Sequence, residues 1–253
     1  AWPPSYTGAG SSAASDVYKR KAIGTSIAAC EYFKSWDVPS NRILLAPQTF
    51  DVRYFKEQAQ KLRQEHRAPT VLYVGHLNER KGVMYLLTAF ELVHAEFPQA
   101  RLLIAGSGGL QDEMENFIRD KQLEQVVEFA GFIEPGNLPQ LYAQSDVFVL
   151  PSLEDTFGVV AAEALASGLG LVCSKHAGIS SHLTNGETAL IVDPEDPKQI
   201  SDGILQLLQN PEKRQSLVDR SKPFLNQCSP QYNAAIFEEA ISVALEHKHI
   251  QHE

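Results

Sequence analysis

Two acidic residues set eight positions apart are the first candidates for chemistry in this chain. Asp155 and Glu163 lie in the segment PSLEDTFGVVAAEALASG, which spans 151–168. If a helix begins at Phe157, after the apolar run VFVL, its free N–H groups and positive end point into a crevice and favour an acid there. Glu163 lies too deep in this apolar helix for ordinary capping, although a capping role remains the alternative. A buried carboxylate needs hydrogen-bond donors, and a ribose 2′,3′-diol offers two of them.

A second candidate is the loop VGHLNERKG at 74–82. Its Gly75 lets backbone N–H groups approach an anion, and Arg80 and Lys81 supply positive charge just before a helix. We interpret this loop as a phosphate site, with a solvated turn as the alternative. The loop KHAGISSH at 175–182 can close over the same ligand through Gly178.

The glycines of AGSGG, at 105–109, make a weaker candidate because no basic residue accompanies them. A dinucleotide-binding fingerprint would need Gly-x-Gly-x-x-Gly and an acid at the end of the next strand. Here the next strand ends in FAGF, with Glu128 inside the strand. The sequence therefore argues against a nicotinamide-dependent oxidoreductase.

Short apolar runs alternate with amphipathic segments, and this alternation must position the candidate residues. Each run is closed by Gly, Pro, Ser or Asp, which is typical of a buried parallel strand. The predicted strands are 70–75, 100–106, 126–131, 146–152, 169–174 and 188–193. The predicted helices between them are 82–97, 110–123, 138–145 and 157–167. The pattern predicts an α/β fold with a doubly wound parallel sheet, whose ligands bind beyond the carboxyl ends of the strands.

The two ends of the chain do not fit this alternation. A weak strand (22–25), a helix (27–36) and a strand (41–47) open the ordered part, and we expect them to be the last elements of another domain, unable to form a sheet of their own. Turn residues place a boundary within 47–54. Three helices, at 197–210, 211–225 and 230–247, are expected to close the chain. The predicted division is therefore 1–50, 51–228 and 229–253.

Composition excludes several classes of function. The 253 residues carry a net charge of −9, which opposes binding to nucleic acid or to anionic lipid. Cys30, Cys173 and Cys228 lie far apart, as is typical of reduced thiols in a cytoplasmic protein. No apolar run reaches the roughly 20 residues of a membrane span, and the first residues lack a signal-peptide pattern. The charged tail HKHIQHE is a poor candidate for a metal site.

Several motifs in one order carry a family resemblance. They are YVGHLNERKG, LLIAGSGG, VEFAGFI, PSLEDTFGVVAAEALASG and GETALIVDPEDP. Together they resemble the donor-binding, carboxyl-terminal half of the large retaining glycosyltransferase family with the GT-B fold (family four, glycosyl transferases group one). The mark of that family is Glu-x7-Glu, and the spacing assigns Asp155 rather than Glu154 to its first acid. The resemblance runs from about Ile23 to the last helix.

The resemblance implies a Rossmann-like fold and roles for individual residues. Lys81 would hold the diphosphate of a nucleotide sugar such as a UDP or GDP sugar, Asp155 its sugar hydroxyls and Glu163 its ribose. Catalytic roles would fall to Lys81, Arg80 and Asp155. The donor-binding residues it implies are Gly75, His76, Lys81, Phe132, Ile133, Asp155, Thr156, Phe157, Gly158, Val159, Glu163 and Gly178. It implies neither a cofactor nor a metal ion.

Departures from the family pattern bear on the donor rather than on the fold. His76 stands where the family usually has Arg, Asp155 is shorter than the usual Glu, and Ser181 replaces the acid of a Gly-Gly-x-x-Glu motif. The "GxPVV" strand entry of the family reads GLGLV at 168–172.

An amino-terminal domain that would bind a sugar or lipid-linked acceptor is represented only by its last elements, so we expect no transfer by this chain alone. The alternatives are a nucleotide-sugar-binding module without turnover and a nucleotide-sugar epimerase. For the latter, the first 50 residues offer Glu31 and Asp37 but no His as acid or base.

Overall fold

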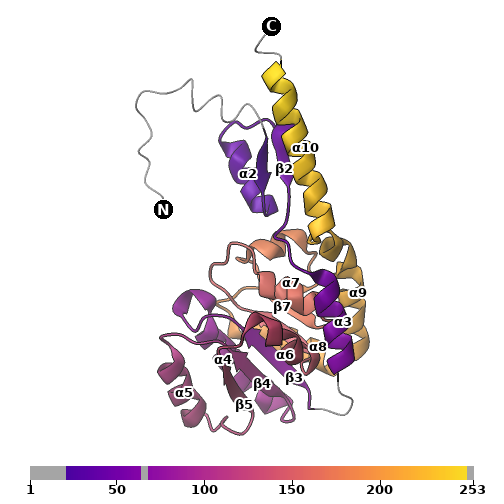
Figure 1. Ribbon diagram of the computed structural model, residues 1–253. Helices are drawn as coiled ribbons and strands as arrows, with labels where there is room; N and C mark the ends of the chain where they lie inside the picture. Colours follow the sequence, from indigo (N-terminus) through magenta and orange to yellow (C-terminus); the bar gives the residue numbers. More distant parts are fainter. Residues whose placement is uncertain (1–20, 64–67, 250–253) are drawn as a thin grey trace. The chain divides into compact units, whose positions relative to one another are not determined.

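The computed structural model describes residues 21–63 and 68–249 and divides them into two compact units (Figure 1). One unit runs from 48 to 230 and contains every candidate site residue. The other combines the described residues up to 47 with those from 231 onwards. Each unit is described by itself below.

The larger unit is built on one six-stranded parallel sheet in the order β5-β4-β3-β6-β7-β8. Its strands are β3 (Thr70–Val74), β4 (Arg101–Ala105), β5 (Val127–Gly131), β6 (Val147–Leu150), β7 (Gly170–Ser174) and β8 (Leu190–Val192). All six predicted strands are confirmed. The chain order reverses between β3 and β6, so these two neighbours form the switch point of a doubly wound sheet, where ligands of such folds bind.

Helices cover both faces of the sheet. They are α3 (Val52–Leu62), α4 (Val83–Glu96), α5 (Gln111–Asp120), α6 (Leu138–Ala143), α7 (Val159–Ala166), α8 (Pro197–Gln209) and α9 (Pro211–Gln227). Apolar residues of α4, α5 and α8 pack on one face and those of α3, α6 and α7 on the other, while α9 contributes Leu217 to the first core and Phe224 and Leu225 to the second. Short 3-10 turns lie at η2 (Glu79–Lys81), η3 (Pro135–Asn137) and η4 (Gly178–His182). The prediction of a doubly wound α/β sheet is confirmed.

Helix α3 lies partly inside the segment predicted to be a turn-rich linker. Asp51 caps it by accepting a hydrogen bond from Tyr54 N at 2.9 Å, and Phe55 and Ala59 are its buried residues. Only a narrow apolar stripe of this helix faces the core. The Pro, Gln and Asp residues before it are typical of turns, so the sequence pattern did not indicate a helix here.

The smaller unit corrects one expectation. Strands β1 (Ala22–Gly24) and β2 (Ile43–Leu45) do form a sheet of their own, a parallel pair connected through α2 (Ile27–Ser35) and η1 (Ser40–Arg42). A helical crossover of this kind is what two sequential parallel strands require. Helix α10 (Pro230–His249) belongs largely to this unit, where Glu239 pairs with Lys21 at 3.2 Å.

Candidate functional site

A pocket of about 240 Å³ opens at the carboxyl ends of β3 and β6. It therefore lies at the switch point of the sheet, where side chains that follow both central strands converge. Seven of the predicted donor-binding residues line it, together with four that were not predicted. Its lining is Gln48, Val74, Gly75, His76, Lys81, Leu150, Asp155, Thr156, Gly158, Val159 and Val160.

Lys81 and Asp155 form an ion pair in this pocket. Lys81 Nζ lies 2.5 Å from Asp155 Oδ2, and the two side chains are only 16% and 11% exposed. Lys81 is held in η2, where Asn78 Oδ1 accepts a hydrogen bond from its backbone N–H at 3.2 Å. The pair brings a cation and a carboxylate, 74 residues apart in sequence, into the same shielded space. Such a pair can offer positive charge to an anion and acceptor oxygens to hydroxyl groups.

The backbone around Asp155 is fixed on both sides. Asp155 Oδ1 accepts a hydrogen bond from Phe157 N at 3.2 Å, and its carbonyl accepts one from Gly178 N at 2.9 Å. A Cβ on Gly178 would lie 2.1 Å from the Thr156 carbonyl oxygen, so only glycine permits this approach. Gly158, at φ +97°, then turns the chain into α7. The first N–H groups of that helix therefore begin at the pocket wall.

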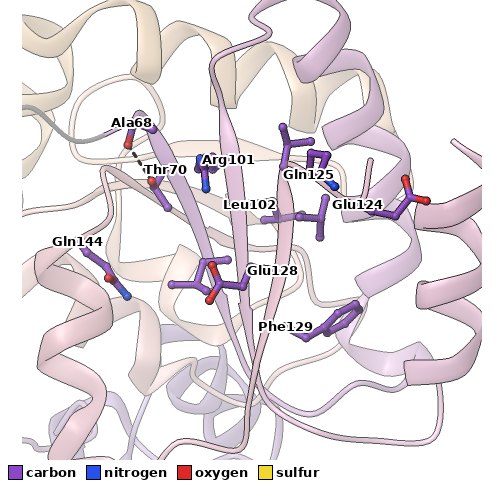
Figure 2. A pocket seen from close by; sticks show the side chains of 12 residues that line it. Ala68, Thr70, Arg101, Leu102, Glu124, Gln125, Glu128, Phe129 and Gln144 are labelled. Carbon is purple, nitrogen blue, oxygen red and sulfur yellow. Dashed lines mark hydrogen bonds between the residues drawn. The ribbon is translucent and has the colours of Figure 1, made fainter. Parts of the chain in front are cut away.

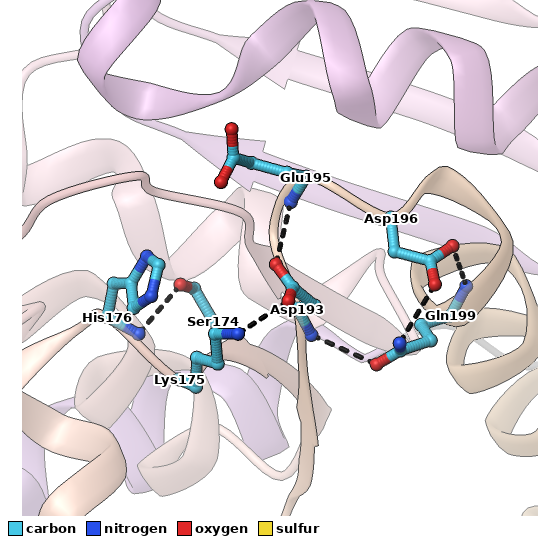
Figure 3. A network of polar contacts seen from close by, with 7 residues as sticks. All are labelled: Ser174, Lys175, His176, Asp193, Glu195, Asp196 and Gln199. Atoms are coloured by element: carbon cyan, nitrogen blue, oxygen red, sulfur yellow. Dashed lines mark hydrogen bonds and ion pairs between the residues drawn. The ribbon is translucent and has the colours of Figure 1, made fainter.

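Figure 3 shows a polar network at the start of the loop after β7, with Lys175 and Asp193 at its centre. Lys175 Nζ lies 2.5 Å from Asp193 Oδ2, and its backbone N–H donates to Val192 O at 2.9 Å. Ser174 Oγ accepts a hydrogen bond from His176 N at 3.0 Å. The ion pair with Lys175 holds the pKa of Asp193 below its ordinary value. The loops after β7 and β8 are thus joined, and they support the segment around Asp155.

The loop after β3 rests on a buried tyrosine. The Tyr73 hydroxyl donates to the His76 carbonyl at 2.9 Å, and burial, followed by the charge of Asp155, raises the pKa of Tyr73. Gly106, at φ +145°, faces the Gly75 carbonyl so closely that a Cβ would lie 1.8 Å from its oxygen. At least Gly106 of the AGSGG segment therefore serves this close packing of two loops.

Glu163 does not line the pocket and instead meets a buried tyrosine. The Tyr142 hydroxyl lies 2.8 Å from Glu163 Oε2. Burial raises the pKa of Glu163 above its ordinary value, while the hydrogen bond from Tyr142 lowers it in part. Sequence reasoning missed Tyr142, because nothing in its apolar surroundings distinguishes it from a core residue.

Several other predicted residues lie outside the lining of the pocket. The Arg80 side chain is exposed and does not line the pocket, although its carbonyl accepts a hydrogen bond from Leu153 N at 2.9 Å. Phe132 is 68% exposed, whereas Ile133 is half-buried against the core. Phe157 is fully buried, and its ring packs near those of His182 and Phe224. Gln48, which does line the pocket, carried no signal in the sequence.

A larger hollow of about 730 Å³ lies at the amino ends of the strands, on the side of the sheet away from the candidate pocket (Figure 2). It is lined by residues from the amino ends of β3, β4 and β5, such as Thr70, Arg101 and Glu128. Figure 2 shows Thr70 Oγ1 donating to the Ala68 carbonyl, at 2.8 Å. Ligands of doubly wound sheets bind at the carboxyl ends of the strands, so we place the candidate site in the smaller pocket.

The described ranges contain neither a group of metal-ligating side chains nor a helix that could span a membrane. No group of three or more His, Cys, Asp or Glu side chains there could hold a metal ion. None of the helices described is both long and apolar enough to cross a bilayer. All three cysteines fall within these ranges, and each is free and buried.

Comparison with known proteins decides the family. Residues 55–223 match the family described as "Glycosyl transferases group 1". The chain belongs to the group 1 glycosyltransferases. The resemblance found in the sequence motifs is therefore confirmed.

Curated members of the group share part of this chain. An uncharacterized glycosyltransferase of Methanocaldococcus jannaschii is 34% identical over 60% of this chain and 39% of its own length. Mannosylfructose-phosphate synthase of Agrobacterium fabrum is 35% identical over 51% of this chain and 30% of its own. Spore coat protein SA of Bacillus subtilis is 32% identical over 67% and 48%. The chain spans half or less of the length of these relatives.

Solved structures of glycosyltransferases share the fold. HepE of Anabaena, in complex with UDP, aligns with a TM-score of 0.76 at 23% identity, over 88% of this chain and 64% of its own. A sucrose-phosphate synthase of Thermosynechococcus elongatus aligns at 0.69 with 26% identity, over 90% and 57%. The carboxyl-terminal domain of the group 1 protein LpcC from Francisella tularensis aligns at 0.62 with 20% identity, over 70% and 96%. These likenesses confirm the GT-B, Rossmann-like fold.

Proposed function

We propose that this chain of a group 1 glycosyltransferase binds a nucleoside diphosphate sugar in the pocket between β3 and β6. The observation that carries the proposal is the Lys81–Asp155 pair, shielded at the switch point and facing the first turn of α7. A diphosphate needs local positive charge in a chain of net charge −9, and Lys81 is the cation that lines this pocket.

Different residues bind the diphosphate, the sugar and the ribose of the donor. Lys81, the backbone at Gly75 and the N–H groups at the start of α7 meet the diphosphate. Asp155 accepts hydrogen bonds from sugar hydroxyls, and Glu163 accepts from the ribose. A volume of about 240 Å³ is below the roughly 300–1,000 Å³ of sites that enclose a whole ligand, so the base extends beyond the pocket, toward Phe132 and Ile133.

The ligands named for similar structures support this class of donor. HepE, which shares the fold over 88% of this chain, is described in complex with UDP and with UDP-glucose. TarM of S. aureus, which aligns with a TM-score of 0.71, is described with UDP. Uridine nucleotides are therefore the first to test here, with guanosine nucleotides second.

The reaction proposed for the whole protein is transfer with retention of configuration. The bond between the anomeric carbon and the diphosphate oxygen breaks while an acceptor hydroxyl attacks from the same face. Its proton passes to the departing diphosphate. Lys81 and the helix start stabilise the charge that builds on that diphosphate, which is the largest single contribution in many such steps. No step in this scheme calls on a metal ion or cofactor.

We further propose that this chain alone binds the donor but does not transfer it. The pocket is lined entirely by residues between Gln48 and Val160, within one compact unit. Transfer also requires an acceptor hydroxyl to be oriented against the anomeric carbon, which contributes several kcal/mol to lowering the barrier. The curated relatives are at least about twice as long as the matched part of this chain. Their additional residues leave room for the part of the protein that would orient the acceptor.

Thermal unfolding with a ligand panel tests the binding proposal. UDP, GDP and their glucose and mannose derivatives are added to the 253-residue chain, with free glucose as the control. A ligand present at about 100 times its Kd should stabilise the fold by about 2.7 kcal/mol and raise Tm by about 5–10 °C. If no nucleotide raises Tm, the chain does not bind such donors. The chain is then incubated with a nucleotide sugar and with sugar or lipid acceptors, and the release of free nucleotide is measured. Turnover of about 1 per second would contradict the second proposal.

A further inference from the structure

Tyr142 is a core residue whose hydroxyl contacts the Glu163 carboxylate. Its side chain is fully buried, and its ring lies 5.8 Å from Phe55, edge-on, and 6.2 Å from Phe148. The hydroxyl lies 2.8 Å from Glu163 Oε2 and 3.3 Å from the Val160 carbonyl oxygen. A phenol has one O–H to donate, and it points to the carboxylate, because that contact is the shorter one and is charge-assisted.

Glu163 stands one helical turn behind the pocket. Val159 lines the pocket, and Glu163 follows it by four positions on the same face of α7. Helical side chains lean toward the amino end of their helix, which directs the Glu163 carboxylate back toward the pocket. Its position thus allows it to reach a ligand whose diphosphate lies at the helix start.

The two carboxylate oxygens of Glu163 are not equivalent. Oε2 accepts a hydrogen bond from the Tyr142 hydroxyl, whereas none of the described residues donates a hydrogen bond to Oε1. A free glutamate side chain samples many rotamers, and a bond from a rigid, packed ring removes much of that freedom. Oε1 is therefore the oxygen whose acceptor sites are all open among the described residues, and it is held in a defined place.

We infer that Tyr142 is a positioning residue that fixes Glu163, so that Oε1 accepts one hydroxyl of the donor's ribose. This inference rests on the proposed function and deepens it. It assigns one oxygen of Glu163 to Tyr142 and the other to the ribose. Tyr142 thereby makes the chain discriminate ribonucleotides from nucleotides that lack this hydroxyl, although it does not touch the ligand.

Calorimetry with UDP and 2′,3′-dideoxy-UDP tests the inference in wild type and in Tyr142→Phe. Phenylalanine keeps the ring and its packing but removes the hydrogen bond to Glu163. We expect Tyr142→Phe to weaken UDP about tenfold and dideoxy-UDP less than about twofold, because only UDP uses Oε1. In a Glu163→Gln background the same change should no longer alter the ratio of the two affinities.

Tyr73→Phe is the matched control, since Tyr73 is also fully buried and also supports the site through its hydroxyl. It lies under the Gly75 loop, so any loss it causes should be equal for UDP and dideoxy-UDP. A further measurement needs no substitution. In wild type, 2′-deoxy-UDP and 3′-deoxy-UDP should differ about tenfold in affinity, because one hydroxyl meets Oε1 and the other does not.

The outcomes separate this inference from the proposed function. Equal losses of UDP and dideoxy-UDP in Tyr142→Phe would overturn the positioning role while nucleotide binding stands. Equal affinities of the two monodeoxy nucleotides would overturn the single-oxygen contact, even if Tyr142→Phe does not fold. If wild type binds neither UDP nor GDP, the proposed function is wrong and the inference is wrong with it.

Discussion

At the scale of single residues, the site depends on two carboxylates with different surroundings. Asp155 is paired with Lys81 at 2.5 Å, whereas Glu163 has the Tyr142 hydroxyl, at 2.8 Å, as its one hydrogen-bond donor among the described residues. A carboxylate beside a diphosphate would repel it, so the ion pair lets Asp155 serve the sugar without opposing the phosphate. Glu163 lies inside α7, eight positions after Asp155, and is the acid that we propose for the nucleoside.

The two acids should therefore fail separately. We expect Glu163→Gln to weaken UDP and UDP-glucose alike, by about 1–3 kcal/mol as for a lost charged hydrogen bond. Asp155→Asn should remove the extra affinity that the sugar contributes but leave UDP binding unchanged or tighter, because Lys81 loses its competing partner. Calorimetry on both variants with both ligands measures this. Equal losses in all four titrations would contradict the assignment.

Neighbouring cations should also differ. Lys81→Met leaves Asp155 uncompensated beside the phosphates, and we expect UDP affinity to fall by about 2 kcal/mol or more, roughly 30-fold. Arg80→Met is the matched control, because Arg80 is exposed and does not line the pocket. Its loss should stay below about threefold, as for a charge that acts through solvent. The same titration with a larger loss in Arg80→Met would reverse the two roles.

We expect the ionised Glu163 carboxylate to lower the stability of the folded chain at neutral pH. Burial raises its pKa above the ordinary 4.5, so the unfolded chain releases this proton at a lower pH than the folded chain does. Stability is therefore lost as pH rises from about 4.5 through the raised pKa. At pH 7 Glu163→Gln should be more stable than wild type by about 1 kcal/mol, or about 2–4 °C in Tm, and nearly equal at pH 4. Thermal unfolding across this range would contradict us if the variant were less stable at pH 7.

At the scale of elements, glycines let the loops after neighbouring strands touch. Gly82 has φ +66° and ends η2 directly after Lys81. A Cβ there would lie 2.0 Å from the Pro151 carbonyl oxygen, at the end of β6. The loop that carries Lys81 is thus pressed against the segment that leads to Asp155.

Gly82→Ala should consequently damage both stability and binding. A left-handed alanine costs about 1–2 kcal/mol, and the contact with Pro151 adds to it, so we expect a loss of about 2 kcal/mol or more together with weaker UDP binding. Gly109→Ala is the control, because a Cβ at Gly109 meets nothing within 4 Å. It should stay within about 0.5 kcal/mol of wild type. Denaturant unfolding of the two variants decides, and equal stabilities would show that the loop can move away.

The same elements show what the sequence could and could not predict. Buried strands such as 146–152 and 169–174 were visible because both faces are covered, which makes the run continuously apolar. The convergence of Lys81 and Asp155 followed from their places after two parallel strands. Their direct pairing did not, since periodicity gives no distance between side chains. The Tyr142 contact was hidden for the same reason.

At the scale of the whole molecule, the candidate site belongs to one compact unit, residues 48–230. A parallel sheet with helices on both faces buries its own core, so we expect this unit to carry donor binding. The family match covers nearly the same part, residues 55–223. We therefore expect donor binding to be a property of this unit, separable from transfer.

The most direct test of the account is a crystal structure of this chain with bound UDP, or GDP if UDP does not bind. We expect the diphosphate to lie between Lys81 and the first turn of α7, with one ribose hydroxyl on Glu163 Oε1. The pocket between β3 and β6 would then be filled. A nucleotide seated instead in the larger hollow at the amino ends of β3, β4 and β5 would contradict the account.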